Sequence, residues 1–178
     1  DAISLLLVPK DTANVNLVPL VTTAGDKMFE VSFNCAAVPA DNVLGDLNKA
    51  WTALDIALQK ATALKTLEMV GGMQAALDMT LEYAKHRVAF GRPIGSFQAV
   101  HHHLADMYRE TETSRLLAYE AVWRLSQGLP ASREVSLAKS RVNQASGFVT
   151  RMAHQIYGGV GYYIEAPLEI YTRRSIAG

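Results

Sequence analysis

The sequence predicts a mainly α-helical protein, an antiparallel up-down helical bundle preceded by a few β-strands of an incomplete β domain. Near the start of the chain, apolar and polar residues alternate, which is the period of a half-buried strand. From about Asn48 onward, apolar residues recur every three or four positions, which is the period of a helix buried on one face. The helical stretches are long and their connections are short, which favours a bundle. We therefore expect strands in residues 1–45 and helices in residues 46–178.

The first 45 residues predict two or three strands. A short apolar run from Ile3 to Val8 ends at Pro9, and Lys27 to Phe33 alternates between apolar and polar residues. Two or three strands are too few for a stable sheet, so we expect the tail of a β domain whose other strands lie upstream. The first residues contain neither an initiator Met nor a signal peptide, which indicates a piece of a longer chain. Cys35 is expected to be a small buried strand residue.

The first helix is predicted from Ala50 to Arg87, a stretch without proline. Gly71 and Gly72 interrupt its apolar pattern, and a glycine within a helix costs about 1 kcal/mol relative to alanine. A close approach of another backbone would explain why glycine stands at these positions.

Three more helices are expected after the first. The second is predicted from Ser96, a good N-cap residue, to Gln127, where a Gly-Leu-Pro sequence ends it. The third runs from Ser132 to Tyr157, and a turn from Gly158 to Gly161 follows. A short final helix is predicted from Ala166 to Arg174, with a proline in its first turn.

The composition excludes several classes of function. Lys plus Arg and Asp plus Glu number 17 each, so the net charge gives no reason to expect nucleic acid as a partner. One cysteine permits neither a disulfide within the chain nor a cysteine-based metal site, and it favours a reducing, intracellular compartment. No apolar stretch reaches the roughly 18 to 20 residues of a membrane span.

The predicted loop between the first two helices carries groups suited to an anionic, planar ligand. Arg87 and Arg92 offer guanidinium groups that bind phosphate in a fork. Phe90 and Phe97 offer flat apolar faces, and Gln98 offers an amide that can donate and accept hydrogen bonds. The alternative is an ordinary interhelical loop with two solvated arginines.

A second stretch, Gln155 to Tyr162, places three glycines within four residues at a helix end. Backbone amides exposed there can hold phosphate or ribose oxygens. The alternative is a plain helix C-cap and turn, which explains at least one of the glycines. A Rossmann fingerprint does not fit, because that motif opens a helix after a strand and this one closes a helix.

In this order, the two stretches resemble signatures of the acyl-CoA dehydrogenase family. The first is similar to R-x-x-F-G-(K/R)-x-I-x-x-F-Q, and the second to Q-I-x-G-G-x-G-(Y/F). Glu165-Ala166-Pro167 follows where the family usually has E-Y-P, and residues 38–51 resemble the junction between its middle β domain and its C-terminal helical domain. The resemblance covers nearly the whole chain.

The resemblance implies a flavoprotein in which FAD lies at a subunit interface of a homotetramer. Residues of the first motif would contact the FAD of a neighbouring subunit. Residues of the second motif would contact the adenosine end of the FAD. These expected cofactor residues are Arg87, Phe90, Phe97 and Gln98, then Gln155, Gly158 and Gly159.

The family's activity implies an acyl-CoA substrate, oxidised to the trans-2-enoyl-CoA, and an electron-transfer flavoprotein or similar acceptor. It implies a cytoplasmic protein, or a mitochondrial matrix protein in a eukaryote. The chain is expected to supply FAD contacts and the core of the oligomer. The other class of function left open is a non-catalytic scaffold or partner subunit of a related assembly.

The chain departs from the family pattern where the substrate is expected. Thr62 and Gln59 stand where the family usually has Arg and Asp on the first bundle helix, which weakens the expectation of CoA contacts from this helix. Some members place the catalytic Glu at the position of Ala61, which cannot act as a base. Most have it in a Y-E-G-T segment, which would lie just beyond Gly178. We therefore predict no catalytic residue within this sequence.

Four other features carry weaker hypotheses. Adjacent residues on a helix point about 100° apart, so three consecutive histidines cannot bind one metal ion together. Glu68 could be a displaced base, although it lies roughly 10 Å along the helix from Ala61. The two tryptophans are expected to pack in the core or at an interface. These features are His101 to His103, Glu68, Trp51 and Trp123.

Overall fold

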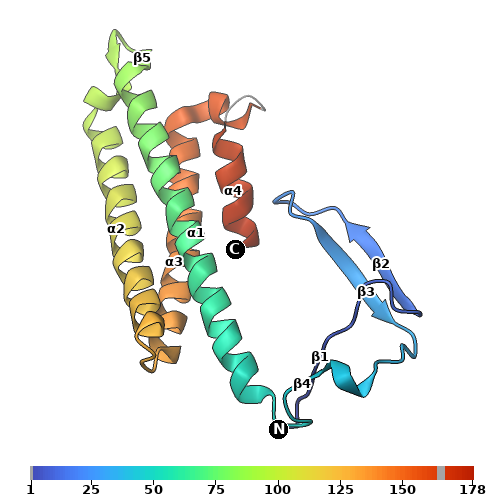
Figure 1. Ribbon diagram of the computed structural model, residues 1–178. Coiled ribbons are helices and arrows are strands. Elements are labelled where there is room, and N and C mark those ends of the chain that lie inside the picture. Colours follow the sequence, from blue (N-terminus) through green and yellow to red (C-terminus); the bar gives the residue numbers. More distant parts are fainter. Residues whose placement is uncertain (1, 164–166) are drawn as a thin grey trace. The chain divides into compact units, whose positions relative to one another are not determined.

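The computed structural model describes residues 2–163 and 167–178, which fold as two compact units, residues 1–58 and 59–178. The chain is mainly helical, as predicted (Figure 1). The predicted Glu165-Ala166 and the start predicted for the last helix lie outside the described residues.

The first unit contains two small antiparallel sheets. β2 (Val15–Leu20) pairs with β3 (Met28–Phe33) along its whole length, from Val15 opposite Phe33 to Leu20 opposite Met28. β1 (Leu5–Leu6) pairs with β4 (Val43–Leu44), which follows a 3₁₀ turn, Ala40–Asn42. The prediction for Lys27 to Phe33 is confirmed, whereas only two residues of the predicted first strand pair.

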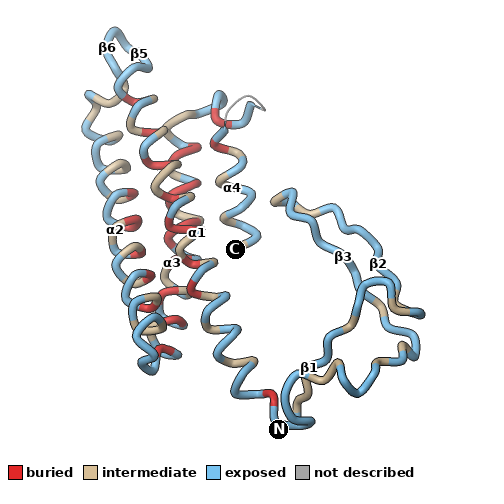
Figure 2. The backbone as a smooth tube through the Cα atoms, viewed as in Figure 1, coloured by how far each residue is buried: buried red, intermediate tan, exposed pale blue. Residues whose placement is uncertain are grey.

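Most side chains of this unit are exposed within the chain, including apolar ones on both strands of the longer hairpin (Figure 2). A two-stranded ribbon has no second layer on which to bury them. The expectation of a buried Cys35 is wrong, because this residue is exposed in the bend after β3 and has a φ of 53°. That left-handed backbone is incompatible with a place inside a regular strand.

The second unit is built from long helices with short connections. α1 (Trp51–His86) begins in the first unit and continues into the second, α2 (Gln98–Ser126) follows a small hairpin, and α3 (Ser132–Tyr157) follows a tight turn. A 3₁₀ turn, Gly158–Tyr162, comes before α4 (Leu168–Ala177). Both predicted ends of the third helix are confirmed.

Two details of the predicted helices are wrong. Ser96 is not the N-cap of α2, because it lies in a 3₁₀ turn (Ile94–Ser96) and its hydroxyl donates to the carbonyl of Pro93. Phe97 takes the N-cap position instead. Gly71 and Gly72 lie within a continuous helix, and no backbone atom of any other described element lies within 4 Å of a Cβ placed on either. A Cβ at Gly71 would meet nothing within 4 Å, and one at Gly72 would meet only a ring carbon of Tyr171 at 3.7 Å.

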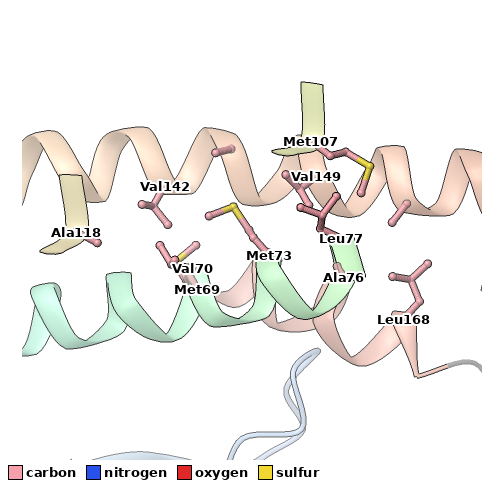
Figure 3. Close-up of a cluster of buried hydrophobic side chains, with 12 residues drawn as sticks. Met69, Val70, Met73, Ala76, Leu77, Met107, Ala118, Val142, Val149 and Leu168 are labelled. Carbon is pink, nitrogen blue, oxygen red and sulfur yellow. The ribbon is translucent and has the colours of Figure 1, made fainter. Parts of the chain in front are cut away.

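The main core lies among α1, α2, α3 and α4. Figure 3 shows Met73 and Leu77 of α1 facing Met107 of α2 and Val142 and Val149 of α3. These side chains are at most 1% exposed, so their apolar surface stabilises the unit at roughly 25 cal/mol per Å² removed from water. Trp51 and Trp123 are 50% and 56% exposed and do not belong to it.

Candidate functional site

The first motif forms a two-residue hairpin at one end of the helical unit (Figure 1). β5 (Val88–Ala89) pairs with β6 (Arg92–Pro93), and Phe90 and Gly91 make the turn with φ values of 54° and 79°. Positive φ at both central residues is the type I′ turn that suits the twist of a hairpin. The predicted loop is therefore an ordered element that presents Phe90 at its tip.

Aromatic and cationic groups meet at the base of this hairpin. The guanidinium carbon of Arg92 lies 4.1 Å from the centroid of the Phe97 ring, a cation–π distance. The Phe90 ring meets the Phe97 ring edge to face, with centroids 6.2 Å apart. Phe90 itself is 96% exposed, so one face of this aromatic pair remains open to a ligand.

Arg87 and Gln98 flank the hairpin and are both exposed. Arg87 follows the last turn of α1, where its backbone N–H donates to the carbonyl of Tyr83 at 2.8 Å. Within residues 2–163 and 167–178, no carboxylate pairs with its guanidinium. Its N–H donors are therefore available to bind an anionic ligand.

The second motif ends α3. Gly158 has a φ of 63° and its N–H donates to the carbonyl of His154, which closes the helix. Gly159 is exposed, and a Cβ placed on either glycine would meet nothing within 4 Å. Gln155 is exposed on the last turn of α3. The open backbone of this turn can accept a close ligand.

The two motifs lie at the same end of the helical unit, where the end of α1 meets the end of α3. Tyr83 and Tyr157 stack there with ring centroids 4.1 Å apart. Burial, and then the neighbouring Tyr83, raise the pKa of the Tyr157 hydroxyl, and this hydroxyl donates to the backbone carbonyl of Met79 at 3.1 Å. Sequence reasoning missed both tyrosines, although Tyr83 stands one helical turn before Arg87.

A buried histidine supports the second motif from below. The Nε2 of His154 lies 2.8 Å from the hydroxyl oxygen of Thr172 in α4, and its ring stacks on Tyr162 at 4.5 Å. In the described part of the chain its Nδ1 has no hydrogen-bond partner. Burial lowers the pKa of this imidazole, and the Glu169 carboxylate opposes the shift.

The first bundle helix offers no carboxylate at the position where some family members carry the base. Ala61 is exposed and Thr62 is partly buried. Glu68 is half exposed, its carboxylate lies 3.1 Å from the Lys65 ammonium, and it lines a cavity of about 90 Å³ with residues of α3 and α4. Its ion pair and its distance from Ala61 do not favour the displaced-base hypothesis.

Within the described residues, neither a metal site nor a membrane-spanning helix is found. His101 and His102 are exposed near the start of α2. Among the residues that the structure describes, no group of three or more His, Cys, Asp or Glu could hold a metal ion. In the same residues, no helix has the length and apolar character needed to cross a membrane.

Comparison with known proteins identifies relatives over nearly the whole chain. The family described as "Acyl-CoA dehydrogenase, C-terminal domain" matches residues 51–177. The probable acyl-CoA dehydrogenase YngJ of Bacillus subtilis is 36% identical over 178 residues, covering 96% of this chain and 46% of that protein. The short-chain specific acyl-CoA dehydrogenase of Megasphaera elsdenii is 34% identical over 145 residues, covering 82% of this chain and 38% of that protein.

Solved structures agree with the sequence relatives. Butyryl-CoA dehydrogenase from Megasphaera elsdenii superposes with a TM-score of 0.93 at 28% identity, over 99% of this chain and 47% of that one. A structure titled "PigA with FAD and proline" superposes with a TM-score of 0.91 at 27% identity, over 97% of this chain and 46% of that one. The chain spans about half the length of the relatives it matches.

Proposed function

The chain belongs to the acyl-CoA dehydrogenase family, and from this premise we propose that it is the FAD-contacting, subunit-associating part of an enzyme that oxidises acyl-CoA to trans-2-enoyl-CoA. Residues 1–45 would then be the end of the middle β domain, and residues 46–178 the C-terminal helical domain. The observation that carries the proposal is the presence of two exposed motifs at one end of the helical unit, with an arginine and open glycine backbone.

The residues present fit FAD. The guanidinium of Arg87 would pair with a pyrophosphate oxygen, and the Phe90 and Phe97 rings would contact the planar part of the cofactor. Gln98 would hydrogen-bond beside them. When bound, FAD would accept a hydride from the β-carbon of the thioester.

The second motif would hold the adenosine end of the same FAD. Gln155 would donate or accept through its amide, and the unobstructed backbone at Gly158 and Gly159 lets a ribose or phosphate approach closely. By resemblance to the family, both motifs would contact the FAD of a neighbouring subunit. A structural relative whose title names FAD supports the choice of cofactor.

The proton would be removed by a base outside this sequence. Ala61 carries no titratable group, and Glu68 is held by Lys65. The electron acceptor would be an electron-transfer flavoprotein or a similar protein, which is consistent with a structural relative titled "Electron transferring flavoprotein of Acidaminococcus fermentans". A cytoplasmic location, or the mitochondrial matrix in a eukaryote, would suit such a partner.

Assembly as a homotetramer would cover apolar side chains that the single chain leaves exposed. Leu116, Tyr119 and Trp123 of α2 recur at helical spacing and are 56–69% exposed. Aromatic side chains of this kind are enriched in protein interfaces. A second copy of the chain is the partner that the family relationship favours.

A second candidate function is a non-catalytic partner subunit. Ala61 and Thr62 favour it, because neither supplies the groups that family members place there. A relative titled as the ChsE4-ChsE5 complex shows that two different chains can assemble in related structures. The intact flavin motifs favour the enzyme.

The test of the proposed cofactor site is Arg87→Ala in the full-length protein. Loss of a charge-assisted contact to the pyrophosphate should weaken FAD binding by about 1.5 to 3 kcal/mol. Isothermal titration of the apoprotein with FAD measures the change. Arg133→Ala is the matched control, since Arg133 is exposed near the start of α3, at the other end of the bundle. Equal FAD affinity in the two variants would show that Arg87 is only a solvated residue.

A further inference from the structure

The stacked tyrosines join the ends of α1 and α3 by two reciprocal hydrogen bonds. The Tyr83 hydroxyl donates to the backbone carbonyl of Tyr157 at 3.4 Å, and the Tyr157 hydroxyl donates to that of Met79 at 3.1 Å. The rings are nearly parallel, with 11° between their planes. Each helix end is thus held by a side chain of the other.

The first motif is built directly on the Tyr83 side of this pair. The N–H of Arg87 donates to the carbonyl of Tyr83, and the N–H of Ile94 donates to the carbonyl of Arg87, both at 2.8 Å. Gly95 packs against Ala84, the residue that follows Tyr83, since a Cβ added to Gly95 would lie 2.8 Å from the carbonyl oxygen of Ala84. A shift of Tyr83 would therefore move the whole hairpin.

The second motif is built on the Tyr157 side in the same way. Gly158 follows Tyr157 directly, and the 3₁₀ turn folds back onto it. A Cβ added to Gly161 would lie 2.9 Å from the Cβ of Tyr157 and 3.0 Å from Nδ1 of His154. Tyr157 is therefore fixed from both sides, by the turn and by the Tyr83 ring.

We propose that Tyr83 and Tyr157 are positioning residues, which together act as a clamp that fixes the two flavin-contacting motifs at one separation. The inference rests on the proposed function, because a clamp between motifs matters only if one ligand bridges them. FAD is such a ligand, since its two ends would contact the two motifs. A phenylalanine pair could fill nearly the same volume, but it would lack the two hydroxyl donors that register one helix end against the other.

Comparing a ligand that reaches both motifs with a ligand that reaches only one distinguishes this positioning role from a purely structural one. FAD would contact both motifs, whereas AMP would reach only the motif at the adenosine end. Loss of the clamp lowers the effective concentration of one motif for a ligand already held by the other. It should therefore weaken FAD and leave AMP unchanged.

The experiment measures the dissociation constants of FAD and AMP by titration calorimetry in the full-length apoprotein and its variants. Tyr83→Leu removes the stack and one hydroxyl, and should weaken FAD about tenfold while AMP changes less than about twofold. Tyr83→Phe keeps the ring and removes one hydroxyl donor, so its FAD affinity should lie between those of the wild type and Tyr83→Leu. Thr111→Val is the control, because it removes another buried hydroxyl that donates to a carbonyl, that of Met107 at 2.9 Å, away from both motifs. It should change neither ligand.

Equal weakening of FAD and AMP by Tyr83→Leu, or no weakening of either in a folded protein, would overturn the clamp. If Tyr83→Leu does not fold, the variant with both Tyr83→Phe and Tyr157→Phe takes its place. It should weaken FAD a few-fold relative to AMP, and an unchanged ratio would overturn the proposal. A different result would contradict the proposed function: a wild-type protein that does not bind FAD, or one whose FAD affinity is unchanged by Arg87→Ala.

Discussion

Gly95 has no room for a side chain, because a Cβ there would lie 2.8 Å from the carbonyl oxygen and 3.2 Å from the carbonyl carbon of Ala84. Both atoms belong to the backbone of α1, which cannot yield as a flexible side chain can. Gly95→Ala should therefore destabilise the protein by roughly 1 to 3 kcal/mol. Chemical denaturation followed by circular dichroism measures the change.

Gly147 is the matched control for this prediction. It lies within α3, and a Cβ added to it would meet nothing within 4 Å. Gly147→Ala should stabilise the protein by up to about 1 kcal/mol, because alanine loses less backbone entropy in a helix. A destabilised Gly147→Ala or an unaffected Gly95→Ala would contradict the close packing of Gly95 on the backbone of α1.

His154 makes the stability of the second motif depend on pH. Burial lowers its pKa in the folded state below the ordinary value near 6.5, and in the described part of the chain its Nδ1 has no acceptor for the second proton of a charged ring. The unfolded chain therefore binds the proton more readily than the folded one. Stability should be fully present above about pH 6.5 and should fall as the pH drops below it.

The variant His154→Gln should remove that part of the pH dependence, because glutamine does not titrate. Melting temperatures between pH 5 and 8 for the wild type and the variant provide the comparison. If the melting temperatures of the two proteins fell in parallel with decreasing pH, another titrating group would cause the loss of stability at acidic pH. Thr172 keeps its hydroxyl in either case, so the comparison isolates the imidazole charge.

At the scale of single residues, the sequence predicted which residues form the candidate site better than it predicted how each residue is buried and what it contacts. The motifs predicted which residues stand at the candidate flavin site, and their contact with FAD stays a prediction. Cys35 was expected to be buried because cysteine usually is, but its left-handed backbone places it in an exposed bend. The roles of Tyr83 and Tyr157 depend on a meeting of residues 74 positions apart, which no local pattern contains.

The β5–β6 hairpin is the element whose conformation the sequence predicted least. Phe90 holds a φ of 54° in a type I′ turn, a conformation that asparagine accepts far more readily than an aromatic residue. Phe90→Asn should therefore leave stability unchanged or raise it by up to about 1 kcal/mol. The same variant should weaken FAD binding, because it removes the exposed ring.

Opposite effects on stability and on FAD distinguish a functional Phe90 from a structural one. Thermal melting of the apoprotein and titration with FAD measure the two effects. A loss of stability would show that the ring packs for the fold, since asparagine fits the turn. Unchanged FAD affinity would remove Phe90 from the cofactor site.

The boundaries of the helices show why some elements are easier to predict than others. α3 was predicted at both ends because Gly-Leu-Pro precedes it and Gly158 closes it, and these residues act locally. The N-cap of α2 is Phe97, one residue later than the predicted Ser96, because Ser96 ends the 3₁₀ turn that follows the hairpin. β2 was missed, since Pro19 argues against a strand interior yet is tolerated in a ribbon of two strands.

At the scale of the molecule, the chain leaves apolar side chains exposed on both of its units. The chain spans about half of the length of its relatives, and both faces of the β2–β3 hairpin carry exposed apolar side chains. The fold class was predictable because the bundle forms from helices close in sequence. What covers the exposed faces could not be predicted, because no pattern within these residues specifies a partner surface.

The chain of 178 residues should not dehydrogenate any acyl-CoA, even with added FAD. Removal of the α-proton needs a carboxylate within about 3 Å of it. Ala61 has none, and Glu68 lies about two helical turns further along α1 with its carboxylate 3.1 Å from Lys65. The assay combines the purified chain with a panel of acyl-CoAs, FAD and an artificial electron acceptor. Turnover above background would mean that a base lies within this sequence. Glu68→Gln would then be the first variant to test, because Glu68 carries the only carboxylate among the described residues that line the cavity formed by α1, α3 and α4.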